Sequence, residues 1–206
     1  ADGRAAMSTG RRARVGAAKR EDPERLIAAD LRAVARATAL LEGDPMRAIP
    51  LSRGRDLVTL PPLRSSETAA AACARALEAD PAWQRDLPIV VVNPNAGDMA
   101  LERRWPAECT AELLRGLADT GNLNLVLTGS NGERPYVESL VTLAGIEGRA
   151  VIAAGKVDLE GFVALLQRAA VVVTNDSGPL HLARAAGAPV VALFGPETPV
   201  LYGPLS

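Results

Sequence analysis

The sequence predicts an α/β protein built on a doubly wound, Rossmann-like parallel sheet. Five short runs rich in Val, Ile and Leu occur after residue 88, and segments with helical spacing of apolar residues separate them. Such runs are typical of strands buried on both faces, and their alternation with helices is typical of parallel sheets. The loops after these strands carry nearly all the Asn, Gly, Ser and Asp of the region. We therefore expect a ligand site at the carboxyl edge of the sheet, where the strand order reverses.

The chain before residue 88 shows no such alternation. Residues 1–21 are rich in Ala, Gly and Arg and are expected to form a flexible basic tail. Residues 22–87 are expected to form a helical segment and a linker, because helix signals flank a proline-rich stretch. The elements expected there are a helix over residues 22–43, an edge strand over residues 56–60, and an Ala-rich helix that Ser66 caps and that ends near Ala79.

The regular part of the chain, residues 88–206, forms the predicted ligand-binding domain. Pro106 and Gly121 bound its first helix, and Asp158 caps its third. The expected strands are residues 89–92, 123–127, 151–155, 169–173 and 189–194.

The bulk composition limits the class of protein. The net charge of −1 gives no reason to expect nucleic acid as a partner. No apolar run approaches the ~18 residues of a membrane-spanning helix, and the Arg-rich amino end lacks the apolar core of a signal peptide. Cys73 and Cys109 form no metal-binding pattern. We expect a soluble, cytoplasmic protein without a transmembrane segment. Neither the dinucleotide-binding glycine motif nor a P-loop is present.

Residues 174–182, Thr-Asn-Asp-Ser-Gly-Pro-Leu-His-Leu, join a buried run to the next helix. The proline suits a first helical turn, and the amides of a helix start favour anions. His181 is the only histidine, and it follows Gly178 and Ser177 by three and four residues. It is therefore expected to share a helix face with them and to point at the same pocket. The alternative is that Asp176 or Ser177 merely caps the helix and that His181 packs against the sheet.

Polar motifs and a closing segment occur along the chain in the order 93–98 (Asn-Pro-Asn-Ala-Gly-Asp), 103–106 (Arg-Arg-Trp-Pro), 129–133 (Gly-Ser-Asn-Gly-Glu), 174–182, and 194–199 with 202–204. With these motifs, the chain from about Ile89 to Leu205 resembles the carboxyl-terminal, donor-binding half of glycosyltransferase family nine. This is the family of ADP-heptose:lipopolysaccharide heptosyltransferases.

The resemblance implies one half of a two-domain fold called GT-B, in which a nucleotide sugar lies against this half. It implies inverting transfer of a heptose-like sugar from an ADP-heptose-like donor to a lipid-linked or oligosaccharide hydroxyl, with no cofactor. No D-x-D motif is present, which agrees with the metal-independent chemistry usual for this fold. An acceptor of this kind would bring the protein to the inner face of the membrane.

The family's acceptor-binding half opens with a Gly-Asp motif after its first strand, and the acid of that motif is the proposed catalytic base. Nothing in residues 1–87 matches that motif. Residues 22–87 are therefore interpreted as the remnant of the acceptor half with the interdomain linker, and residues 88–206 as the donor-binding domain. The base itself is expected to lie outside this chain, so the catalytic residue is unknown and the chain alone supplies mainly donor binding.

The roles of the site residues combine the resemblance with the chemistry of each side chain. The amides of Ser177 and Gly178 and the guanidinium of Arg103 are expected to bind the diphosphate of the donor. Glu133 is expected to accept hydrogen bonds from both ribose hydroxyls, as the family's matching glutamate does. A carboxylate beside phosphates repels them, so Asp176 is expected to bond sugar hydroxyls or to orient the histidine.

These roles have structural alternatives. Glu133 can be a charge that interacts with the dipole of the following helix, and Arg103 and Arg104 can be a solvated pair of which only one matches the family's cation. The full set of predicted donor-binding residues is Asn95, Arg103, Ser130, Glu133, Asp176, Ser177, Gly178 and His181, with no metal ligand.

Two other functions stay open. One is a non-catalytic module that binds a sugar nucleotide without an acid-base partner. The other is a sugar-nucleotide epimerase with the GT-B fold, which needs acid and base carboxylates within this half. The carboxylates available to it at the loop ends are Asp98, Glu133, Asp176 and Glu197.

Overall fold

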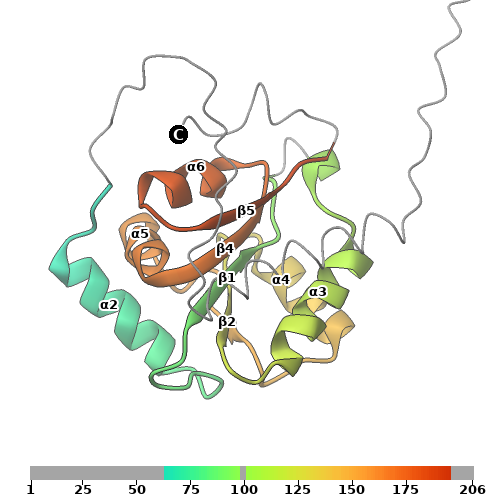
Figure 1. The fold of residues 1–206 in the computed structure, drawn as a ribbon, viewed down its shortest axis with the longest axis horizontal. Coiled ribbons are helices and arrows are strands. Elements are labelled where there is room, and N and C mark those ends of the chain that lie inside the picture. The colour runs from blue at the N-terminus through green and yellow to red at the C-terminus, as the bar shows by residue number, and fades with distance from the viewer. Residues whose placement is uncertain (1–62, 98–100, 196–206) are drawn as a thin grey trace, which may run out of the picture.

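A computed structural model describes residues 63–97 and 101–195. Its centre is a five-stranded parallel sheet with the strand order β3-β2-β1-β4-β5 (Figure 1). The strands are β1 (Ile89–Asn93), β2 (Asn124–Leu127), β3 (Val151–Ile152), β4 (Ala169–Asn175) and β5 (Val190–Leu193). The helices are α2 (Glu67–Glu78), α3 (Ala107–Asp119), α4 (Arg134–Ala144), α5 (Leu159–Arg168) and α6 (Gly178–Ala185), with a 3₁₀ turn, η1 (Leu101–Arg103).

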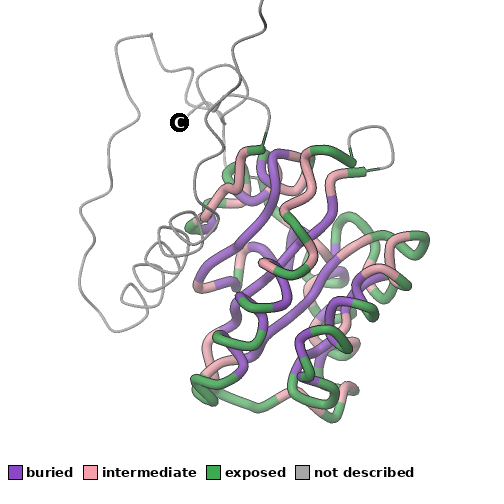
Figure 2. The backbone as a smooth tube through the Cα atoms, turned by 90° about the vertical axis from the view of Figure 1, so that its right-hand side faces the viewer, coloured by how far each residue is buried: buried purple, intermediate pink, exposed green. Residues whose placement is uncertain are grey.

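Helices cover both faces of the sheet, so the predicted doubly wound class is confirmed. Figure 1 shows α3 and α4 on one side and α2, α5 and α6 on the other. Alternate residues of each strand face opposite sides: Val90 and Val92 pack with α3 and α4, whereas Ile89 and Val91 pack with the other helices. Figure 2 shows the buried backbone running through the middle along the strands. This two-sided burial explains why the strands are continuous runs of apolar residues.

Two predicted helix caps are confirmed. The Ser66 Oγ accepts a hydrogen bond from the Ala69 amide at 3.2 Å, which caps α2. The Asp158 Oδ1 accepts one from the Gly161 amide at 2.7 Å, which caps α5. In each case the side chain satisfies an amide that has no partner within the helix.

The third strand is shorter than the sequence predicts. It was expected over residues 151–155, but β3 contains only Val151–Ile152. The chain then turns, with a hydrogen bond from the Lys156 amide to the Ala153 carbonyl, and Gly155 has a φ of +70°. A left-handed residue cannot continue a strand. The helix predicted over residues 22–43 and the strand predicted over residues 56–60 lie outside the described residues.

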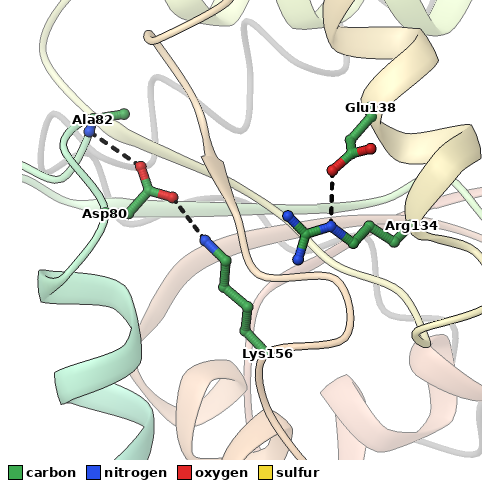
Figure 3. Close-up of polar contacts among 5 residues, drawn as sticks. All are labelled: Asp80, Ala82, Arg134, Glu138 and Lys156. Carbon is green, nitrogen blue, oxygen red and sulfur yellow. Dashed lines mark hydrogen bonds and ion pairs between the residues drawn. The ribbon is translucent and has the colours of Figure 1, made fainter.

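Helix α2 belongs to the same packed unit as the sheet. Its Cys73 and Leu77 are buried in the core that α5 also lines. After α2, the Asp80 carboxylate accepts hydrogen bonds from the Ala82 amide and, at 3.0 Å, from the Lys156 ammonium (Figure 3). The predicted domain start at residue 88 therefore leaves out a helix that shares this core.

No helix in the described part of the chain is both long enough and apolar enough to cross a membrane.

Candidate functional site

A cavity of about 680 Å³ lies at the carboxyl edge of the sheet. The loops after β1, β2 and β4 line it, together with the segment that leads into α5. Because β2 and β3 lie on one side of β1 and β4 and β5 on the other, the strand order reverses between β1 and β4. Ligands of open parallel sheets bind in the crevice at this reversal. The cavity therefore lies at the edge that the sequence predicts.

The turn from β4 into α6 forms one wall of the cavity. Asp176 is buried, and its amide donates to the Leu193 carbonyl at 3.0 Å. Ser177 occupies the N-cap position, but its hydroxyl bonds the Asn175 carbonyl and makes no capping bond to α6. Gly178 starts the helix, and all three residues from Asp176 to Gly178 line the cavity. The structure therefore does not support the alternative in which Asp176 or Ser177 serves only to cap the helix.

The two arginines before α3 have different surroundings. The Arg103 Nη1 lies 3.6 Å from the Asp176 Oδ2, and Arg103 lines the cavity. The guanidinium carbon of Arg104 lies 4.4 Å from the centre of the Tyr136 ring, a cation–π geometry. Burial raises the pKa of Tyr136, while the charge of Arg104 opposes that rise. The two arginines are therefore not a solvated pair: Arg103 lines the cavity, and Arg104 is stacked on Tyr136 of α4.

Glu133 and Ser130 hold each other in the loop after β2. The Ser130 amide donates to the Glu133 Oε2 at 2.8 Å, and the Glu133 amide donates to the Ser130 Oγ at 3.3 Å. Glu133 occupies the N-cap position of α4 without a capping bond, and both residues line the cavity. Both predicted readings of Glu133 are compatible with this position, because the carboxylate is at the cavity wall and at a helix start.

Asn95 and Gly129 bring the loops after β1 and β2 into contact. The Asn95 Nδ2 donates to the Thr128 carbonyl at 3.0 Å. A Cβ added to Gly129 would lie 2.7 Å from that nitrogen and 3.3 Å from the Glu133 Cβ. A methyl group at this position would therefore require the Asn95 side chain to shift. Within the described residues, the buried Asn95 Oδ1 has no hydrogen-bond partner.

His181 is the predicted site residue that the structure does not bring to the cavity. It is exposed and does not line the cavity, nor does it pack against the sheet as the alternative had it. Pro179 and Leu182 line the cavity instead. These two residues are three positions apart and share a face of α6, so the intervening His181 points elsewhere. Asp176 is paired with Arg103, so the predicted contact between Asp176 and His181 is not formed.

Sequence reasoning missed two features of the site. One is an apolar wall that Val157, Leu159 and Phe162 form beside Leu182. The other is Asn175, which is buried between Pro94 and Trp105 and bonds the backbone of both. The apolar wall is marked by an apolar side chain that is unusually exposed, since Leu159 is 67% exposed. Within the described residues, no three His, Cys, Asp or Glu side chains gather to hold a metal ion.

A profile described as "Glycosyltransferase family 9 (heptosyltransferase)" matches residues 23–206. The chain belongs to glycosyltransferase family 9. It is 37% identical over 106 residues to lipopolysaccharide heptosyltransferase 2 of Escherichia coli, a match that covers 50% of this chain and 30% of that protein. It is 33% identical over 151 residues to lipooligosaccharide heptosyltransferase 2 of Haemophilus influenzae, covering 72% of this chain and 42% of the relative. The resemblance read from the motifs is confirmed.

The fold also matches solved structures of the family. The E. coli ADP-heptose lipopolysaccharide heptosyltransferase II superposes with a TM-score of 0.63 and 28% identity, over 74% of this chain and 45% of that one. The family 9 glycosyltransferase of Veillonella parvula superposes with a TM-score of 0.61 and 27% identity, over 69% and 39% of the two chains. The matched part of this chain thus covers less than half the length of these relatives.

Proposed function

We propose that this chain binds the nucleotide-sugar donor of an inverting heptosyltransferase, which transfers a heptose-like sugar to a lipopolysaccharide-type or oligosaccharide hydroxyl. The observation that carries the proposal is the combination of groups in one cavity. The cavity is lined by a guanidinium, two carboxylates, an apolar wall and a helix start that has no side-chain cap. A nucleoside diphosphate sugar has matching parts: a flat base, a ribose, a diphosphate and a second sugar.

The diphosphate is assigned to Arg103 and the start of α6. Negative charge grows on this group as it leaves the sugar, so a fixed cation and oriented amides stabilise the transition state more than the bound donor. A hydrogen bond to a charged group is worth roughly 1.5–3 kcal/mol. The ion pair between Arg103 and Asp176 aims the guanidinium before the donor arrives. Preorganisation of this kind avoids reorganisation during the reaction.

The two carboxylates are assigned to hydroxyls. Glu133 uses Oε2 to accept the Ser130 amide, which fixes the carboxylate where a ribose can bond it. Asp176 is buried, and among the described residues its Oδ2 lacks a hydrogen-bond donor although Arg103 lies 3.6 Å away. A hydroxyl of the transferred sugar supplies such a donor. The apolar wall of Val157, Leu159 and Phe162 suits the face of the base.

We propose that donor binding needs no metal ion and that the acceptor is lipid-linked, which brings the enzyme to the cytoplasmic face of the membrane. Arg103 and the start of α6 support the first point, because a guanidinium and oriented amides at the diphosphate can do the work that a metal ion does in other enzymes. The membership in family 9 supports the second, since relatives are lipopolysaccharide and lipooligosaccharide heptosyltransferases.

The same contacts make the epimerase alternative weaker. An epimerase needs an acid and a base that exchange protons with the substrate. Of the four carboxylates considered for it, Asp176 faces a guanidinium and Glu133 holds the Ser130 amide. The other two, Asp98 and Glu197, lie outside the described residues. A non-catalytic binding module makes the same donor contacts, and transfer activity distinguishes it from a transferase.

Calorimetric titration of the full chain with ADP, UDP and GDP, each with and without a chelator, tests the proposal. We expect binding of one nucleoside diphosphate in the presence of the chelator, and tighter binding of its sugar conjugate. Loss of binding on chelation contradicts the metal-independent proposal. No binding of any of the three, or of their sugar conjugates, contradicts donor binding itself.

A further inference from the structure

We propose that Asn175 is a positioning residue that sets Arg103 in place by holding both ends of the segment that carries it. The proposal rests on the donor-binding function above, in which Arg103 contacts the diphosphate. Asn175 itself does not line the cavity. Its role is to join two stretches of backbone that the sequence separates.

The contacts of Asn175 are with backbone groups far away in the sequence. Its side chain is buried at 1% exposure. The Nδ2 donates to the Pro94 carbonyl at 2.9 Å and to the Asn95 carbonyl at 3.4 Å. The Oδ1 accepts from the Trp105 amide at 3.2 Å. An asparagine offers two N–H donors and an acceptor oxygen, and here all three are engaged.

These contacts tie the two ends of one segment to β4. Pro94 and Asn95 follow β1, whereas Trp105 immediately precedes α3, and Arg103 lies two residues before Trp105. The next residue after Asn175 is Asp176, whose carboxylate lies 3.6 Å from the Arg103 guanidinium. The last residue of β4 therefore fixes the backbone on both sides of Arg103, and the residue after it supplies the charge that faces Arg103.

The chemistry at position 175 leaves few substitutes. Alanine leaves the Pro94 carbonyl and the Trp105 amide without the partners that the structure gives them. Aspartate keeps the acceptor for Trp105 but turns an oxygen toward the Pro94 and Asn95 carbonyls, which repel it. Either change frees the segment, and Arg103 is then held less firmly opposite Asp176.

Asn124 provides a matched control at the opposite edge of the sheet. It is the first residue of β2 and is 2% exposed. Its Nδ2 donates to the Gln84 and Leu87 carbonyls at 2.8 and 3.2 Å, and its Oδ1 accepts from the Gln84 amide at 2.8 Å. The two asparagines thus make the same kinds of bonds, but of the two only Asn175 joins a segment that contains a residue of the carboxyl-edge cavity. Asn124→Ala reports the cost of losing such a network without touching the site.

The experiment is a double-mutant cycle measured by calorimetric titration of the full chain with ADP. The proteins are the unaltered chain, Asn175→Ala, Arg103→Ala, the double variant and Asn124→Ala. We expect Arg103→Ala to weaken binding about ten- to hundredfold, the worth of one charge-assisted hydrogen bond. We expect Asn175→Ala to weaken it about tenfold in the unaltered background, but by less than about twofold when Arg103 is already alanine. Asn124→Ala lowers the melting temperature and leaves ADP affinity unchanged.

Each other outcome has a definite meaning. Equal, additive losses for Asn175→Ala in both backgrounds show that it does not act through Arg103 and overturn this inference alone. Unchanged ADP affinity in Asn175→Ala also overturns it. An equal loss in Asn124→Ala shows a general effect of stability on binding and does the same. If Asn175→Ala does not fold, Asn175→Asp takes its place in the cycle. Failure of the unaltered chain to bind ADP, UDP, GDP or their sugar conjugates overturns the proposed function together with the inference.

Discussion

The amino edge and the carboxyl edge of the sheet each contain a buried asparagine with the same kinds of hydrogen bonds, but only the carboxyl edge carries the candidate site. At each edge a buried asparagine binds two backbone carbonyls and one amide, Asn175 at the carboxyl edge and Asn124 at the amino edge. A cavity lies at each edge, of about 680 Å³ at the carboxyl edge and about 270 Å³ at the amino edge. Neither a buried asparagine that bonds the backbone nor a cavity is therefore enough to identify the functional site.

What separates the edges is whether the polar groups satisfy one another. At the amino-edge cavity, Arg149 and Asp119 form an exposed ion pair at 2.8 Å. Among the described residues, the buried side-chain oxygens without a hydrogen-bond partner are the Asn95 Oδ1 and the Asp176 Oδ2, and both belong to residues of the carboxyl-edge cavity. Buried polar groups are nearly always hydrogen-bonded, so an exception calls for an explanation. A ligand with hydroxyl donors provides one.

The largest expected effect comes from removing the cation at the carboxyl edge. Arg103→Ala should weaken ADP binding about ten- to hundredfold, because it removes a charge-assisted contact to the diphosphate. Arg104→Ala should weaken it less than about threefold, because Arg104 is stacked on Tyr136. Calorimetric titration measures both, and Arg149→Ala at the amino edge is the control that should change nothing. Equal losses for Arg103→Ala and Arg104→Ala contradict the division of roles between them.

A smaller effect is expected from filling the space between the loops after β1 and β2. Gly129→Ala places a methyl group 2.7 Å from the Asn95 Nδ2 and 3.3 Å from the Glu133 Cβ. Overpacking of this kind costs about 1–3 kcal/mol of stability, and the displacement of Glu133 should weaken ADP binding about three- to tenfold. Thermal unfolding and ADP titration measure the two effects.

The matched variant is Gly116→Ala in α3. A Cβ at Gly116 meets nothing within 4 Å, and the residue is exposed within the helix. Alanine there should raise stability by up to about 1 kcal/mol without changing ADP affinity. If Gly129→Ala is as neutral as Gly116→Ala for binding, the close approach of the two loops has no part in holding Glu133.

The elements of the fold were predictable because their signals are local. Runs such as residues 89–92 are apolar at every position because helices cover both faces of the sheet. Ser66 and Asp158 bond amides only three residues away, so their capping roles follow from spacing alone. The early end of β3 was not predictable in this way, since the hydrogen bond from the Gly155 amide to the Gly129 carbonyl is a contact between loops.

The location of the site could be predicted from the sequence, but the contacts between its residues could not. The rule for parallel sheets located the carboxyl edge, and the motifs indicated Arg103 and Asp176. Spacing alone directed His181 to the cavity, which it does not line, because the face that α6 turns to the cavity depends on how the helix packs, and that face carries Leu182. Asn175 was missed because its partners are about 70 to 80 residues away along the chain. The roles of the individual donor-binding residues stay predictions.

The smallest expected effect tests whether the attachment of α2 is independent of the carboxyl-edge site. The Glu160 Oε1 accepts the Ser66 amide at 2.7 Å, which links the start of α5 to the start of α2. Hydrogen bonds from the side chain and the backbone amide of Ser66 hold the pKa of Glu160 below its ordinary value of 4.5. A carboxyl whose pKa is lowered in the folded state stabilises that state above its unfolded pKa.

This stabilisation should therefore be present at neutral pH and fade as the pH falls below 4.5 and through the lower pKa of the folded state. Glu160→Gln lacks the titrating group, so its denaturation midpoint should lie slightly below that of the unaltered chain at neutral pH and converge with it as the pH falls below the lowered pKa of the folded state. Because Glu160 is fully exposed, the difference is expected to be small. Glu147→Gln removes another exposed carboxylate and serves as the control for the loss of one negative charge, while ADP affinity should be unchanged in both variants. A loss of ADP affinity in Glu160→Gln would show instead that the attachment of α2 and the carboxyl-edge site are coupled through α5, whose first residue, Leu159, lines the cavity.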